Sequence, residues 1–388
     1  MFRISRFGEV MKHLPRGVFE RAVRAQQAEK YRKGFGCWQH LVSMVYAQLS
    51  GASSLRVLER SFNAQGMHHY HLGCGRLHRS TLAEANARTD GAVFAVLAQA
   101  LMEQARGKLA RQGRQLLRLI DSSSITLKGE GFAWTRAHRT RHTQGLKLHV
   151  MFDPAGQIPL AQGLTMPNVN DIQYARSLAI EPGSIYVFDK AYCDYSWWWR
   201  IHCGGARLVS RFKRNARLQV LGERRIGRSA RGLILKDQRV RLSNRNPGAS
   251  RTNPYRGTLR RIEVARAGQA PLVLVTNDLK SSALNIAEHY RQRWQIELFF
   301  KWLKQHLRIK SFLGRSHNAV RIQILTALIA YLLVHLDAQA KKITTSLWLY
   351  LCELRASLFQ RPQIDWHRHR KWRQQRAWLQ LHQSRLFA

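Results

Sequence analysis

The chain has 388 residues, of which 64 are Lys or Arg and 23 are Asp or Glu, so its formal net charge is +41. With 45% hydrophobic residues, 11 Trp, 15 Phe and 11 Tyr, its composition is that of a folded protein with sizeable cores, which excludes a disordered basic protein. So large a positive charge predicts a polyanionic partner and binding that weakens steeply as salt rises.

The five cysteines form no Cys-x-x-Cys pair and are odd in number, which predicts free thiols in a reducing compartment. The N-terminus shows no signal peptide, so we expect a cytoplasmic protein. The most apolar segment, residues 322–336, is shorter than the roughly 20 residues that a membrane span needs. It is therefore predicted to be a buried helix, with no membrane involved.

Residues 1–110 are predicted to be all-helical. The run from Trp38 to Leu49 has apolar residues at helical spacing, and Ser53 or Ser54 is suited to cap the helix that follows. The many Arg and Lys residues of this region favour a DNA-binding role. The alternative is a module that serves only packing or dimerisation.

Residues 111–212 read as the first part of an α/β domain. Apolar runs predict strands, including one from Leu116 to Asp121 and one from Ile185 to Asp189, and helical patterns lie between them. The resulting order of strands and helices predicts a mixed sheet flanked by helices. The expected ranges are strands at 116–121, 146–152, 157–165, 185–189 and 206–211, a further strand starting at 125–127, and helices at 171–179 and 195–202.

The second half of the chain divides into three regions by composition. Residues 213–270 are rich in Arg, are punctuated by Gly and carry short β-like runs, so they read as an inserted β region. Residues 271–340 resume the sheet domain with a strand at 272–279 and helices at 289–308 and 320–336. Residues 341–388 are predicted to be a basic helical tail.

The segment from His289 to Arg308 has no Gly or Pro and is predicted to be one amphipathic helix. At about 100° per residue, one carboxylate and five basic or phenolic groups fall in a single stripe, and an apolar stripe lies to one side for packing. Such a mixed stripe suits a metal ion and a phosphate held together, although a solvated basic face has the same pattern. The stripe consists of Tyr290, Arg293, Glu297, Lys301, Lys304 and Arg308.

Three acids stand out in a chain that has few. Asp121 and Asp189 each end an apolar strand, and Glu297 lies on the helix just described. Three carboxylates from separate elements can converge on two divalent cations, which activate water or a 3′-hydroxyl at a phosphodiester. A single Asp at the end of a strand is often only a cap or a turn residue, so the evidence lies in the combination.

At these positions the chain resembles a known family. Tyr290, Arg293, Glu297 and Lys304 match the Tyr-x2-Arg-x3-Glu-x6-Lys signature of the insertion-sequence-four group of DDE transposases. The segments that resemble other motifs of this group are Leu-Ile-Asp121-Ser-Ser, Asp189-Lys-Ala-Tyr, Gly145-Leu-Lys-Leu-His149 and Asn170-Asp171. The first 75 residues or so resemble a helical leader found on some of these bacterial proteins, and the likeness weakens beyond residue 340.

The resemblance implies an RNase H-like catalytic core interrupted by a β insertion. It also implies two Mg²⁺ or Mn²⁺ ions, no small-molecule cofactor, and cut-and-paste transposition of double-stranded DNA, both terminal inverted repeats and target. A homodimer would bring the two element ends together. By the same resemblance, Asp121, Asp189 and Glu297 are the catalytic, metal-binding triad, and Tyr290, Arg293 and Lys304 hold DNA phosphates. We expect further phosphate contacts from Lys301, Arg308, Lys190 and Lys147.

One departure from the family concerns the aromatic residue that is thought to receive a flipped base in hairpin-forming members. Residues 213–270 contain no Trp and only one aromatic ring, that of Tyr255. Either Tyr255 takes this role or the strand-processing route differs. Trp197, Trp198 and Trp199 follow Asp189 closely, and we expect two of the three to be helix core rather than base-stacking platforms.

Two rival functions remain for the sequence. One is an RNase H-like nuclease that cuts without strand transfer. The other is a DNA-binding repressor that has lost catalysis, which the complete set of triad positions disfavours.

Overall fold

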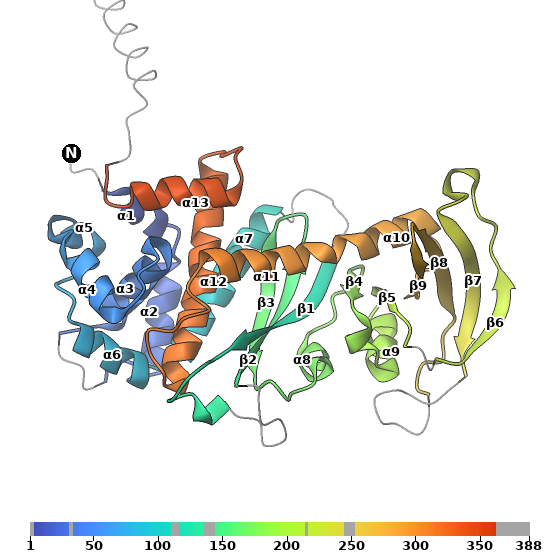
Figure 1. The fold of residues 1–388 in the computed structure, drawn as a ribbon, viewed down its shortest axis with the longest axis horizontal. Coiled ribbons are helices and arrows are strands. Elements are labelled where there is room, and N and C mark those ends of the chain that lie inside the picture. Colours follow the sequence, from blue (N-terminus) through green and yellow to red (C-terminus); the bar gives the residue numbers. More distant parts are fainter. Residues whose placement is uncertain are drawn as a thin grey trace, which may run out of the picture.

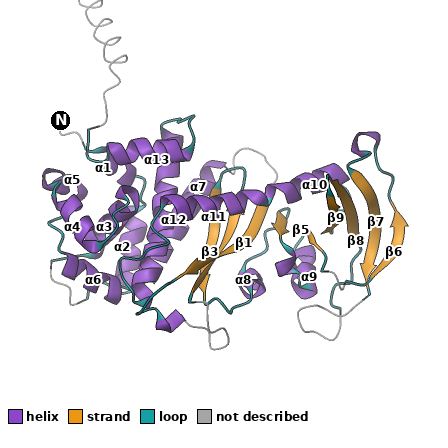
Figure 2. Ribbon diagram, in the orientation of Figure 1, coloured by secondary structure: helices purple, strands orange, loops and turns teal. Residues whose placement is uncertain are grey.

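A computed structural model describes residues 4–30, 34–109, 116–135, 144–213, 216–243 and 253–361. Helices make up the N-terminal part, and a long twisted sheet with helices along it makes up the rest (Figures 1 and 2). The apolar side chains of both parts join in one continuous buried cluster. The two parts therefore share a core.

The N-terminal part is helical, as expected. Its central helix, α3, is buried over most of its surface, and it ends at Gly51, whose left-handed backbone (φ 72°) suits glycine. Ser54 caps the next helix by accepting a hydrogen bond from the backbone N–H of Val57 at 3.2 Å. The helices are α1 Arg6–Met11, α2 Arg16–Ala25, α3 Cys37–Ser50, α4 Leu55–Asn63, α5 His69–Leu72, α6 Arg79–Arg88 and α7 Ala92–Leu109.

Within the described residues, nine strands form one sheet in the order β3-β2-β1-β4-β5-β9-β8-β7-β6. The pairs β1–β4 and β4–β5 are parallel, and the other neighbours are antiparallel. This confirms the expected RNase H-like mixed sheet with a β insertion. The strands are β1 Leu117–Thr126, β2 Gly145–Asp153, β3 Ile158–Thr165, β4 Ile185–Phe188, β5 Arg207–Arg211, β6 Leu218–Glu223, β7 Ile234–Leu242, β8 Leu259–Arg266 and β9 Gln269–Thr276.

The first strand is longer than the sequence suggested. We expected a strand ending at Asp121 and a new one starting at Ile125, but β1 runs unbroken to Thr126. The reason is pairing: β2 lies antiparallel to β1 from Leu119 to Thr126, so the Ser122–Ser124 run is held as strand although it is polar. Asp121 therefore lies in the middle of β1.

The expected single helix over residues 289–308 is two helices laid end to end. Helix α10 (Ala283–Gln292) and α11 (Trp294–His306) meet at Arg293, whose backbone is still helical (φ −51°, ψ −33°), and they run along the sheet as one rod (Figure 1). Leu307 is extended and ends the rod, so Arg308 lies outside it. On the other side of the sheet lie α8 (Asp171–Ser177) and α9 (Tyr195–Cys203).

Helix α12 (His317–Ala340) stands between the N-terminal helices and the sheet domain (Figure 1). Its 24 residues are long and apolar enough to cross a membrane, so the length argument from the sequence was wrong. However, 89% of its most apolar window is buried against the rest of the chain, which is the burial of a central core helix. Helix α13 (Leu347–Ala356) packs on it, and the predicted basic tail lies largely outside the described residues.

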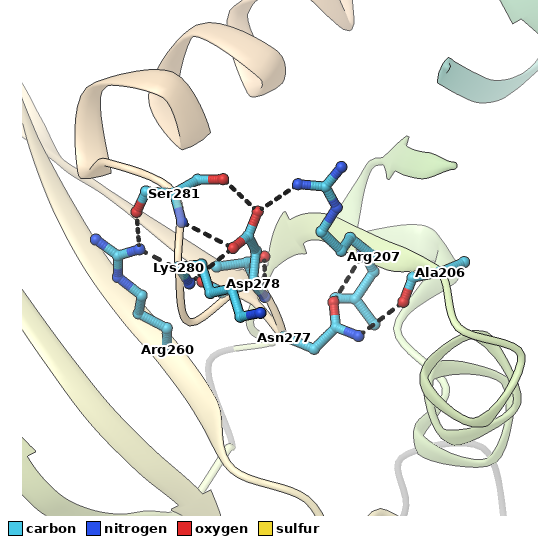
Figure 3. Close-up of polar contacts among 9 residues, drawn as sticks. Ala206, Arg207, Arg260, Asn277, Asp278, Lys280 and Ser281 are labelled. Carbon is cyan, nitrogen blue, oxygen red and sulfur yellow. Dashed lines mark hydrogen bonds and ion pairs between the residues drawn. The ribbon is translucent and has the colours of Figure 1, made fainter. Parts of the chain in front are cut away.

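The inserted strands β6–β8 extend the sheet, and a buried polar network fastens them to it (Figure 3). Asp278, just after β9, accepts hydrogen bonds from the hydroxyl of Ser281 at 2.6 Å and from the guanidinium of Arg207 at 3.0 Å. The guanidinium of Arg260, on β8, binds both carboxylate oxygens of Asp237 on β7 and donates to the carbonyl of Ser281. The loop between β9 and α10 is thus tied to β5, β7 and β8.

Candidate active site

The two aspartates of the expected triad are neighbours in the sheet. Strands β1 and β4 are parallel with Ile120 opposite Phe188, so the next position on each chain is Asp121 and Asp189. Strand β4 stops at Phe188, which leaves Asp189 at its carboxyl end and Asp121 beside that end. In an α/β sheet this edge is where ligands are usually bound.

The carboxyl group of Asp121 is poorly solvated. Its burial raises the pKa to about 6, and the nearby acids Glu297 and Asp189 add to this rise. The backbone N–H of Ser122, which donates to Asp121 Oδ1 at 2.8 Å, and the guanidinium of Arg293 oppose the rise without cancelling it. The fold therefore holds a carboxylate whose negative charge is only partly compensated.

Helix α11 brings the third carboxylate to the same place. Helix α11 packs on β1, and the guanidinium of Arg293 joins the two acids: its Nη1 lies 2.6 Å from Glu297 Oε1 and 3.9 Å from Asp121 Oδ2. The same guanidinium lies over the ring of Tyr290, 5.7 Å from its centroid. Tyr290 is buried and lies close enough to Asp189 for that carboxylate to raise its pKa, although burial is the larger cause.

A basic hollow of about 320 Å³ opens over these acids. Glu297 and Asp121 line it, and so do Lys301 and Lys304 from the next turns of α11. The ammonium group of Lys304 donates a hydrogen bond to the carbonyl of Ser124 at 2.8 Å, so the lysine side chain contacts strand β1. The predicted stripe therefore exists from Arg293 to Lys304. Its side chains lie on the side of the helix that faces Asp121.

The hollow also contains a lysine that the sequence analysis missed. Lys310 lies in the loop after α11, where the chain turns back beside the helix, and it lines the same hollow. A residue in an irregular loop has no periodicity and belongs to no motif, so nothing in the sequence pointed to it.

Three other predicted DNA contacts, Lys190, Lys147 and Arg308, do not line the hollow. Lys190 is exposed next to Asp189, and its backbone N–H donates to that carboxylate at 2.7 Å. Lys147 is occupied inside the fold, since its ammonium binds Asp171 Oδ1 at 2.9 Å and the carbonyl of Val169 at 2.8 Å. Its side chain holds α8 against β2.

Arg308 also has a structural position. Because the helix ends before it, Arg308 turns away from the stripe, and its Nε donates to the carbonyl of Gly51 at 2.9 Å. Its backbone N–H donates to the side chain of Gln48 at 2.7 Å. The residue therefore joins the end of α11 to the N-terminal helices.

The aromatic residues settle one open question from the sequence. Tyr255 is only 2% exposed, its hydroxyl bonds the ring of His202 at 3.0 Å, and its ring packs edge-on against Trp199. It therefore has no face available for a base. Trp197 and Trp198 are buried in the core as expected, and Trp199 is partly exposed.

The acids suit a hard divalent cation by their chemistry, since carboxylate oxygens are the ligands that Mg²⁺ and Mn²⁺ prefer. The uncompensated charge of Asp121, with Asp189 beside it, fits such an ion. Nevertheless, among the residues that the structure describes, no three His, Cys, Asp or Glu side chains are grouped closely enough to hold a metal. In this arrangement the carboxylate of Glu297 is paired with the guanidinium of Arg293.

Comparisons with known proteins identify relatives of this chain. Residues 112–333 match the family described as "Transposase DDE domain", and residues 3–75 match a domain of unknown function. A protein of Sinorhizobium fredii assigned as transposase y4zB is 42% identical over 286 residues, which cover 73% of this chain and 78% of the relative. The probable transposase for insertion sequence element IS5377 of Geobacillus stearothermophilus is 27% identical over 299 residues, 76% of each chain.

Among solved structures, the cryo-EM structure of the piggyBac transposase synaptic complex with hairpin DNA aligns with 92% of this chain and 81% of its own, at a TM-score of 0.45 and 11% identity. This similarity is too low to support a fold assignment. The assignment is based on the sheet order described above. The family match covers more than half of the sequence, and the relative from Sinorhizobium is similar over most of its length. The chain belongs to the DDE transposases, the DNA-cleaving enzymes of insertion sequences.

Proposed function

We propose that this transposase moves its element by cut-and-paste transposition, with hydrolysis of the element ends followed by strand transfer into target DNA. The observation that supports the proposal is that Asp121 and Glu297 line one hollow together with the lysines of α11, while Asp189 lies at the adjoining end of β4. Acids for metal binding and cations for phosphate binding are both needed at a phosphodiester, and here they share one hollow.

Two divalent cations fit the proposal, and DDE family membership implies divalent metal use. Asp121 and Asp189 would hold the ions, joined by Glu297 when its partner Arg293 turns to a DNA phosphate. When bound, such ions activate the attacking water or 3′-hydroxyl and stabilise the leaving oxygen. The burial of Asp121 serves this purpose, because a desolvated carboxylate binds a cation more strongly than a hydrated one does.

The chain's own cations would position the DNA. Lys301, Lys304 and Lys310 surround the acids, so a scissile phosphate placed between them is held against the carboxylates and its charge is offset. The ring of Tyr290 stabilises the guanidinium of Arg293 by a cation–π contact. We infer that the N-terminal helices bind the terminal inverted repeats, that a homodimer pairs the two ends, and that the protein acts in the bacterial cytoplasm on the nucleoid.

A reaction with DNA that carries the cognate terminal repeats tests this function against its rivals. Transposition predicts excised ends and strand-transfer products in the presence of Mg²⁺. A nuclease of the same fold would give cleaved ends without joined products. A repressor would retard the DNA in a gel without cutting it, and either of these results would contradict the proposal.

Substitution of Glu297 by Gln tests the active site directly. We expect Glu297→Gln to lower cleavage by more than about a hundredfold, because even partners outside the coordination shell of a metal cost 10–100-fold when they are lost. DNA binding should persist, since a carboxylate makes no phosphate contact. Glu288→Gln is the matched control, because Glu288 is an exposed acid on α10 that pairs with Arg291. Retained cleavage in Glu297→Gln would dismiss the triad.

A further inference from the structure

A second cavity lies beside the basic hollow. Its volume is about 620 Å³, and it lies between the end of β1, the loop that follows β1, and the loop after α11. A volume of this size is within the range of sites that hold small organic ligands. Its lining includes the cations Lys128, Lys304, Lys310 and Arg315 and the aromatic rings of Phe132 and Phe312.

The lining combines two chemistries. Four of its side chains are cationic and none is a carboxylate, among the residues that the structure describes. The remaining wall is largely apolar and includes two aromatic rings, those of Phe132 and Phe312. A ligand that satisfies both parts carries an anionic group and a flat, poorly hydrated group.

Two of the cations, Lys304 and Lys310, lie close enough for their charges to repel each other. Burial lowers the pKa of Lys304, and the like charge of Lys310 lowers it further. Like charges in one partly buried site repel each other, and the repulsion is relieved when an anion binds between them. The cluster therefore points to an anionic ligand.

Contacts within the protein hold the two sides of the cavity together. The indole N–H of Trp134 donates to the carbonyl of Arg315 at 2.9 Å, and its ring packs edge-on against His317. These contacts connect the loop after β1 to the loop after α11 and fix the two sides of the cavity. A preformed site loses less conformational entropy when a ligand binds.

The cavity adjoins the hollow over the acids, and this position indicates which anionic ligand it would bind. Lys304 and Lys310 line both this cavity and the hollow that contains Asp121 and Glu297. A DNA strand whose scissile phosphate lies at the acids therefore places a neighbouring nucleotide at the cavity. Only an unpaired base can enter, because a paired base has its faces and edge covered by its neighbours.

We propose that this cavity, which we name the nucleotide cavity, binds one unpaired nucleotide flanking the cleaved phosphodiester. Lys304 and Lys310 bind its phosphate, and its base lies against Phe132 and Phe312. This inference rests on the proposed function and adds to it a site for the single strand exposed during cleavage.

The test compares two DNA probes of equal charge. Each is a duplex with a short single-stranded thymidine extension, and the second lacks one base in that extension, with the abasic position scanned along it. The full-length protein should bind the intact probe about fivefold or more tightly than the abasic probe at one position, as expected for one stacked base. Fluorescence anisotropy measures both affinities, and equal charge cancels the general attraction to DNA.

Three variants locate the effect. Ser311→Trp fills the cavity from an exposed position without removing a charge, and it should abolish the preference for the intact probe. Ser53→Trp, an exposed serine among the N-terminal helices, should keep the preference. Lys310→Ala should weaken binding of both probes equally. Should Ser311→Trp fail to fold, Phe312→Leu is expected to reduce the preference in its place.

A wild-type protein that binds both probes equally, or a folded Ser311→Trp variant that keeps the preference, would overturn the nucleotide cavity. Neither measurement involves cleavage. If the preference is present and no DNA is cut, the proposed function fails and the cavity stands. If DNA is cut and no preference exists, only the cavity inference fails.

Discussion

Arg293 controls the charge balance among the acids. Its guanidinium pairs with Glu297 at 2.6 Å and approaches Asp121 at 3.9 Å, so it offsets part of the negative charge of both carboxylates. The side chain is only 18% exposed and is supported by the ring of Tyr290. If Glu297 binds a divalent cation as proposed, Arg293 and that ion would compete for the same carboxylate.

This competition predicts a gain of metal affinity on removal of the guanidinium. In the absence of DNA, Arg293→Gln should bind Mn²⁺ roughly fivefold more tightly than the wild type, because a partly exposed ion pair is worth about 1 kcal/mol. Isothermal titration calorimetry measures the change. Arg291→Gln, which removes an exposed guanidinium paired with Glu288, should leave the affinity unchanged. Equal affinities for all three proteins would contradict the competition.

Lys304 gives a second prediction at this scale. Lys304→Ala should weaken binding of an element end and reduce the slope of log affinity against log salt by about one unit, because one phosphate contact is lost. The hydrogen bond to the Ser124 carbonyl is partly exposed, so the melting temperature should change little. Binding titrations at several salt concentrations provide the slope. Lys236→Ala, at an exposed lysine on β7, is the control; an unchanged slope in Lys304→Ala would exclude a phosphate role.

The sequence predicted these residues unequally well. The stripe of Arg293, Glu297 and Lys304 followed from helical spacing, because the geometry of a helix is fixed by its own backbone. The pairing of Arg293 with Glu297, the internal partners of Lys147 and the burial of Tyr255 depend on other segments. No local pattern contains such contacts.

At the scale of elements, the loop between β9 and α10 connects the inserted strands to the catalytic sheet. Burial by itself would raise the pKa of Asp278. Hydrogen bonds from Ser281, from the backbone N–H groups of Ser281 and Lys280, and from Arg207 outweigh burial and lower the pKa to about 2 (Figure 3). The ionised carboxylate thus stabilises this junction.

The junction predicts a pH-dependent loss of stability in Asp278→Asn. Because the pKa in the folded protein is below the ordinary value of 3.8, the stabilisation is complete above that value and disappears as the pH falls towards 2. The variant should therefore lose about 2 kcal/mol of unfolding free energy at pH 7. Urea titrations at pH 7 and near pH 3 should show this difference shrinking, and a constant difference would contradict the role of the charge.

The elements themselves followed from the sequence where local and tertiary preferences agreed. The order of strands and helices around β1 to β5 was predicted because each apolar run forms its own strand. The extension of β1 was not, because Ser122 to Ser124 are strand only through their pairing with β2. Likewise, the end of α11 before Arg308 reflects contacts of that residue with Gly51 and Gln48.

For the molecule as a whole, α12 is the element on which both parts of the chain depend. It contacts α1, α3 and α6 on one side and α7, α11 and α13 elsewhere, and its residues from Ile322 to Leu336 are buried. The side chain of Gln48, on α3, donates to the α12 backbone at Gln323. The segment 3–75 matches its own domain family, yet its packing surface is shared with the rest.

This arrangement predicts that the N-terminal segment cannot be removed cleanly. A chain starting at residue 76 should aggregate or melt without cooperativity, because the loss of α1 to α4 exposes the apolar side of α12. Size-exclusion chromatography and a thermal melt would show it. Replacing Gln48 by Leu in the full chain, which keeps the apolar contacts, should cost only about 1–3 kcal/mol. A truncated chain that is monomeric and melts cooperatively would contradict the shared core.

A frameshift before residue 317 would give a shortened chain that keeps the N-terminal helices and lacks α12. The position of α12, late in the chain yet lodged against the earliest helices, works against such by-products. A polypeptide interrupted before residue 317 lacks the surface on which those helices close. Such truncated chains are therefore expected to be degraded rather than to persist as stable folded fragments.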